Sequence, residues 1–117
     1  MSPTHKPIVW LAEPARTPPI ARGARIEIGY LLRRLQAGER LELPASRPMP
    51  TIGRRVSELR VTDGAGNSEW RVIYRIDEDA VVIAAIFSKK ARATPSQWIE
   101  TSQARLRRYD QRITEEE

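Results

Sequence analysis

The most apolar segment of this 117-residue chain ends in a cluster of cations. It begins at Val81, reads VVIAAIFSKKARATP, and leads into Lys89, Lys90 and Arg92. Ammonium and guanidinium groups placed together bind phosphate, because they donate charge-assisted hydrogen bonds to its oxygens. A strand that simply leaves the core for solvent would also end in polar residues. The cluster therefore raises two alternatives, a phosphate site at a strand end or an ordinary solvated terminus.

Further arginines lie on two alternating segments that precede this strand. RVSELRVTD (residues 55–63) carries Arg60, and EWRVIYRID (residues 69–77) carries Arg71 and Arg75. The sequence GAGN between the two segments is a turn signal, so it predicts a hairpin with Arg60 and Arg71 as neighbours on one face. A sheet edge can tolerate such like charges, but they cost stability. We expect this face to be open and to bind a phosphate-bearing ligand.

The sequence offers few candidate residues for metal-dependent catalysis or for acid–base catalysis by histidine. The only histidine is His5, in an expected N-terminal tail, and the chain has no cysteine. The carboxylates at residues 77–79 fall in a predicted turn, where solvation accounts for them. No glycine-rich phosphate loop with its Lys and Ser or Thr is present. We therefore expect no metal site, no histidine acid–base catalysis and no small-molecule cofactor.

The elements that must position these cations follow from periodicity and turn signals. The expected order is a strand at residues 7–13, a helix capped by Thr17 and Gly38, a proline-rich loop at 42–53, strands at 55–63, 69–77 and 80–87, and a C-terminal helix that Thr94 caps. The last strand is apolar on both faces, so it should be central. Three consecutive strands joined by short turns predict an antiparallel meander with helices packed on it, an α+β fold.

The composition and net charge of the chain indicate its domain organisation and the charge of its partner. The net charge is +5 and the pI is near 10.2, although the last three residues are all Glu. We expect a single domain over residues 1–113 with an acidic tail at 114–117. The basic body favours an acidic partner, either nucleic acid or an acidic protein. No segment has the length of a signal peptide core or a membrane span, so we expect a cytoplasmic protein with no membrane partner.

Three motifs in this order resemble the RelE/ParE superfamily of type II toxins, most closely its phage-related, HigB-like branch. They are ELR (Glu58–Arg60), EWRVIYRID (Glu69–Asp77) and VVIAAIFSKKARATP. The leading IVWL strand, the LLRRLQAGERL helix end and the spacing from Ala104 to Arg108 also fit. The resemblance spans roughly residues 7–109. It implies a compact α+β fold with a curved antiparallel sheet that combines a β-meander and an N-terminal strand.

The resemblance also implies a function. Nuclease members of the superfamily cut mRNA on the ribosome without a metal, through attack of the ribose 2′-hydroxyl on the adjacent phosphate, and a cognate helix-turn-helix antitoxin neutralises them. By this resemblance Arg71 would stabilise the phosphate, and Lys89 or Lys90 would transfer a proton. Arg60, together with Arg75 and Arg92, would bind RNA.

The sequence departs from the family pattern at the proton-transfer groups. RelE carries a tyrosine beyond the basic pair, whereas this chain reads RATPSQW there, and it has no histidine at the site. The general acid and base are therefore not assigned by resemblance. Two alternatives to the nuclease remain, a ParE-type poison of DNA gyrase and an inactive toxin-like binding protein.

Overall fold

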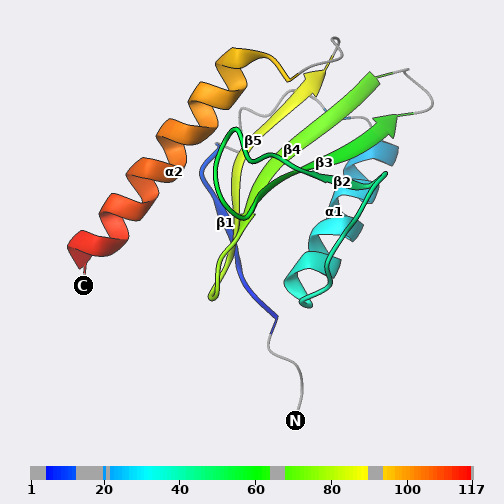
Figure 1. Ribbon diagram of the computed structural model, residues 1–117. Coiled ribbons are helices and arrows are strands. Elements are labelled where there is room, and N and C mark those ends of the chain that lie inside the picture. The colour runs from blue at the N-terminus through cyan, green and yellow to red at the C-terminus, as the bar shows by residue number, and fades with distance from the viewer. Residues whose placement is uncertain (1–4, 13–19, 21, 64–67, 90–93, 117) are drawn as a thin grey trace.

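A computed structural model describes residues 5–12, 20, 22–63, 68–89 and 94–116 of the chain (Figure 1). Its elements are, in chain order, β1 (Ile8–Trp10), α1 (Arg22–Gln36), β2 (Ser46–Pro48), β3 (Val56–Asp63), β4 (Ser68–Ile76), β5 (Val81–Lys89) and α2 (Ser96–Glu116).

The five strands form one sheet in the order β1-β5-β4-β3-β2. The pairs β2–β3, β3–β4 and β4–β5 are antiparallel, so the predicted meander and the α+β class are confirmed. β1 pairs with β5 in parallel, which makes the sheet mixed. β5 is central as predicted, and every residue from Val81 to Phe87 is buried. The apolar run on both faces of this strand reflects a helix packed on each side.

The two helices cover opposite faces of the sheet (Figure 1). The core beneath α1 comprises Ala24, Ile28, Leu31, Leu32, Leu35, Leu59, Val61, Trp70, Val72, Tyr74, Val81, Ile83 and Ile86. The core on the α2 face comprises Met49, Ile52, Val56, Ile73, Ala80, Val82, Ala84, Ala85, Phe87 and Leu106. The predicted alternation of β4, with Trp70, Val72 and Tyr74 on one face, is therefore confirmed.

α1 ends in the left-handed cap that its sequence predicts. Gly38 has φ 91°, a conformation that costs glycine little because it has no Cβ. The Gly38 N–H donates to the Leu35 carbonyl and the Glu39 N–H to the Arg34 carbonyl, both at 3.0 Å, which is the Schellman arrangement. The predicted start at Thr17 lies outside the described residues.

The sequence predicted a loop for the proline-rich segment 42–53, but the segment also contains a strand. This strand is β2, whose residues 46–48 pair with residues 57–59 of β3 at the sheet edge. The Ser46 hydroxyl lies 2.6 Å from the Tyr74 hydroxyl in a buried hydrogen bond. This long-range contact, rather than any local periodicity, stabilises the short strand.

α2 differs from its prediction at both ends. The helix begins at Ser96, two residues after the predicted cap Thr94, whose hydroxyl donates to Glu58 of β3. The first helical bond runs from the Ile99 N–H to the Pro95 carbonyl at 3.3 Å. At the other end, Glu115 and Glu116 belong to the last turn and are exposed, so this part of the acidic tail is helical.

Candidate functional site

Arg60 and Arg71 are direct neighbours across the β3–β4 ladder. They alternate in phase with Val56 and Ile73, which belong to the core on the α2 face. The predicted hairpin register and the shared face of the two arginines are therefore confirmed. Like charges in this position repel one another unless an anion lies between or beside them.

The expectation that this face is open is wrong. Only 2% of Arg71 and 5% of Lys89 is accessible to solvent. α2 packs on this face of the sheet, and Thr94 ahead of it bonds Glu58 beside Arg71. Burial strengthens electrostatic interactions among the cations, because less water screens them.

Glu58 is the residue that sequence reasoning missed. Its side chain is completely buried on β3, and its two oxygens contact groups from three segments. Oε1 lies 3.4 Å from Arg71 Nε and 3.5 Å from Arg47 Nη2. Oε2 accepts a 2.7 Å hydrogen bond from the Thr94 hydroxyl. Its alternation in phase with Arg60 was the signal that could have placed it beside the arginines.

The Arg71 guanidinium is held by one hydrogen bond of ordinary length and by longer contacts with carboxylates. Nη1 donates to the Trp70 carbonyl at 3.1 Å, and Nη2 lies 3.5 Å from Glu69 Oε2. Nε finds no hydrogen-bond partner among the described residues, because the 3.4 Å approach to Glu58 is an ion pair with poor hydrogen-bond geometry. The charge of Arg71 is thus balanced, but its hydrogen-bonding capacity is not filled.

Lys89 adjoins this pair at the end of β5, opposite Glu69 in the ladder. Burial lowers the pKa of the Lys89 ammonium, and the neighbouring charge of Arg71 lowers it further. A lysine with a lowered pKa gives up its proton more readily, which suits it to proton transfer.

The charges at this end of the sheet do not cancel. Among the described residues, the cations are Arg47, Arg60, Arg71 and Lys89, which we call the cation cluster, and the carboxylates beside them are Glu58 and Glu69. A partly buried excess of positive charge is costly unless an anion joins it. Because guanidinium and ammonium groups from four strands converge, the arrangement fits a phosphate. Lys90 and Arg92, predicted to extend this cluster, lie outside the described residues.

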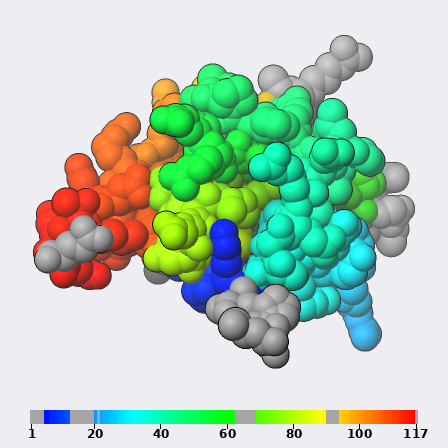
Figure 2. Space-filling view, turned by 60° about the horizontal axis from the view of Figure 1, so that its bottom comes forward, coloured from blue at the N-terminus to red at the C-terminus, as the bar shows by residue number. Residues whose placement is uncertain are grey.

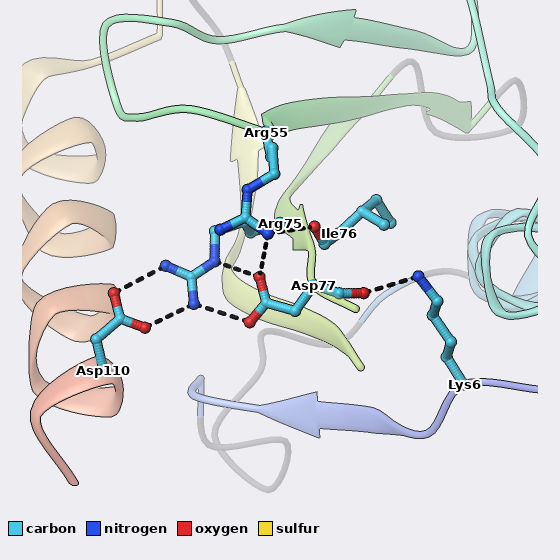
Figure 3. Close-up of polar contacts among 6 residues, drawn as sticks. All are labelled: Lys6, Arg55, Arg75, Ile76, Asp77 and Asp110. Atoms are coloured by element: carbon cyan, nitrogen blue, oxygen red, sulfur yellow. Dashed lines mark hydrogen bonds and ion pairs between the residues drawn. The ribbon is translucent and has the colours of Figure 1, made fainter. Parts of the chain in front are cut away.

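Arg75 lies on the same face of the sheet, opposite Val56, but its environment is different, and Figure 3 shows its polar contacts. Its guanidinium bonds Asp110 of α2 at 2.7 and 3.0 Å and Asp77 at 2.7 and 2.9 Å. The hydrogen bonds to Asp110 raise the Arg75 pKa, and those to Asp77 add to the effect against the cost of burial. Arg75 therefore joins β4 to α2 through two carboxylates. These carboxylates balance its charge, so it needs no phosphate as a partner.

Neither nearby tyrosine supplies a proton-transfer group to the cation cluster. Tyr74 lies on the opposite face, where its hydroxyl bonds Ser46. Tyr109 packs against the α2-face core, and burial raises the pKa of its phenol. Lys89 is thus the titratable group with a lowered pKa beside Arg71.

Within the described ranges, no group of three or more His, Cys, Asp or Glu side chains is close enough to hold a metal ion. The same residues contain no helix with the length and apolar composition needed to span a membrane.

A family model described as "Phage derived protein Gp49-like (DUF891)" matches residues 20–107 of the sequence. The match runs from the segment before α1 into α2, so it includes β3, β4, β5 and every residue of the cation cluster. A search of curated proteins finds no match to the chain.

Proposed function

Because this chain belongs to the Gp49-like family of phage-derived proteins, a RelE-like toxin family, we propose that it is the toxin of a type II toxin–antitoxin system. Its activity in this proposal is ribosome-dependent cleavage of mRNA, as in the HigB-like branch. The observation that carries the proposal is the buried excess of positive charge around Arg71 and Lys89.

The proposed reaction needs no nucleophile from the protein. The ribose 2′-oxygen attacks the adjacent phosphorus, the bond to the 5′-oxygen breaks, and the products carry a 2′,3′-cyclic phosphate and a 5′-hydroxyl. Arg71 stabilises the negative charge that grows on the phosphate oxygens, because Glu58 and the Trp70 carbonyl already hold its guanidinium in place. Lys89 donates a proton to the departing 5′-oxygen, and the 2′-hydroxyl proton leaves to water.

The remaining basic residues have supporting roles in this proposal. Arg60 faces Arg71 across the ladder and binds a neighbouring phosphate. Lys90 and Arg92 follow Lys89 in the sequence and provide further contacts with RNA. Arg75 is left out of the phosphate site, since Asp77 and Asp110 engage its guanidinium.

The family implies an antitoxin partner. In our proposal the antitoxin is a helix-turn-helix protein encoded beside this chain, and the toxin acts in the cytoplasm, where mRNA is translated. The chain requires no cofactor for this chemistry.

The test is controlled expression in a bacterial host. We expect growth arrest, its rescue by the neighbouring antitoxin, and new mRNA ends in primer extension. Intact mRNA together with altered DNA supercoiling would replace the nuclease with a ParE-type gyrase poison. Unimpaired growth with soluble, folded protein would leave an inactive toxin-like binding protein.

A further inference from the structure

A groove separate from the cation cluster lies between β1 and the C-terminal half of α2. Its volume is about 820 Å³, and its lining includes Trp10, Leu11, Arg105, Arg108, Arg112 and Glu115. We call it the α2 groove. Figure 2 shows the red C-terminal turns of α2 projecting at one side of the molecule, opposite the cyan α1.

Three arginines of the α2 groove lie on one face of the helix, because residues 105, 108 and 112 are spaced by three and four positions. Arg105 is partly committed to the fold, since its Nη1 donates to the Ala84 carbonyl at 2.8 Å. The β4–β5 register skips Ala84, so Arg105 satisfies a carbonyl at an irregularity of the ladder. Arg108 and Arg112 are exposed and do not serve the core.

Trp10 supplies an aromatic surface beside these guanidinium groups. It lies on the edge strand β1 and is 42% exposed, although most large apolar side chains of β1 and β5 are covered. An exposed tryptophan next to a row of arginines is the combination with which proteins bind single-stranded nucleic acid. The arginines contact the phosphates, and the aromatic ring stacks on a base.

We propose that the α2 groove binds a single-stranded stretch of RNA, with Arg108 and Arg112 on its phosphates and Trp10 stacked on a base. The choice of RNA over an acidic protein segment rests on the proposed function, and it is favoured by the exposed aromatic ring. Glu115 limits the bound stretch at the far end, because its carboxylate repels a phosphate.

The α2 groove is distinct from the site of cleavage. The cation cluster lies near Thr94, ahead of the first turn of α2, whereas Arg108 is about 18 Å along the helix axis from Ser96 at 1.5 Å per residue. The groove therefore holds RNA that is several nucleotides from the scissile bond or belongs to another strand. Its effect would be on docking rather than on the chemical step.

Binding is measured separately from cleavage with a fluorescein-labelled 15-nucleotide 2′-O-methyl RNA, which lacks the attacking hydroxyl. Fluorescence anisotropy at several salt concentrations gives the slope of log K against log salt. Each phosphate contact with a single strand contributes about 0.7 to this slope. We expect Arg108→Ala/Arg112→Ala to reduce the slope by about 1.4. The control Arg40→Ala/Arg107→Ala removes two exposed charges outside the groove and should leave it unchanged.

Trp10→Ala should weaken binding roughly tenfold or more without changing the salt slope, because it removes stacking and no charge. Circular dichroism checks that each variant is folded. Equal slopes for the wild type and the Arg108/Arg112 variant would overturn the proposal, as would tighter binding of a poly-glutamate peptide at the same residues. Groove binding without mRNA cleavage by the wild type would refute the proposed function and leave this inference intact.

Discussion

Arg71 Nε lies 3.4 Å from Glu58 Oε1, and both side chains are buried on the α2 face of the sheet. The relationship fixes the guanidinium from β3 while leaving its Nε without a hydrogen bond among the described residues. A carboxylate in this position holds the Arg71 guanidinium within the cation cluster and offsets part of its charge. It also makes the two residues depend on each other for stability, since each would otherwise keep only a 3.5 Å contact with a partly exposed partner, Arg47 for Glu58 and Glu69 for Arg71.

Glu58→Gln should lower the free energy of unfolding by about 3–5 kcal/mol, the range for removing one partner of a buried ion pair. Arg71 and Arg47 would then face an amide, although the Thr94 hydroxyl could still donate to it. Urea denaturation measures the change. Glu69→Gln is the matched control, because Glu69 contacts the same arginine but is half exposed, and it should cost about 1 kcal/mol or less. Equal losses in the two variants would show that burial of Glu58 is unimportant.

Lys89→Met should stabilise the folded protein at neutral pH. Because the folded-state pKa of Lys89 is lowered from 10.5, the unfolded chain binds more protons in the interval between the lowered value and 10.5. Stability of the wild type therefore rises with pH across that interval, and the advantage of the methionine variant shrinks. Urea denaturation at several pH values up to 10.5 follows this difference. Lys89→Arg, which stays charged, is the control and should show no such gain. If the stability of the wild type did not change with pH in this interval, the lowered pKa of Lys89 would be contradicted.

Asp110→Asn should loosen α2 from the sheet without affecting RNA cleavage. The change removes the charge partner that joins the helix to Arg75, while Asp77 still engages the guanidinium (Figure 3). We expect a loss of about 1 kcal/mol in unfolding free energy, since Asp110 is half exposed. Hydrogen exchange should increase in the C-terminal turns of α2, and Glu100→Gln on the exposed surface of the helix is the control. A strong loss of cleavage in Asp110→Asn would contradict this assignment and would indicate that Arg75 belongs to the phosphate site.

Much of the sheet could be predicted from local sequence. The alternation of β3 and β4 and the GAGN turn predicted the register that pairs Arg60 with Arg71, and the apolar run of β5 predicted its central position. Gly38 likewise predicted the end of α1, because few other residues accept its backbone conformation. These features depend on neighbours a few residues away, so periodicity and turn chemistry are sufficient.

The missed features depend on contacts between distant segments. β2 has only three residues, and Ser46 is stabilised through Tyr74, which no local pattern encodes. Thr94 has the residue type of a helix cap, but no local pattern predicts that its hydroxyl donates to a buried carboxylate 36 positions away. The burial of Arg71 is likewise not encoded by any local pattern. Alternation assigns a residue to a face, but it does not show whether another element covers that face.

The most direct test of the phosphate site is cleavage by purified protein on ribosomes carrying a defined mRNA, with the product ends identified. We predict a 2′,3′-cyclic phosphate at the mapped site and no cleavage when that nucleotide is 2′-deoxy. Arg71→Lys, which keeps the charge beside Glu58 but loses the guanidinium fork, should fold normally and cleave about 10²–10³ times more slowly. Full activity of folded Arg71→Lys, or undiminished cleavage at the 2′-deoxy position, would contradict the account.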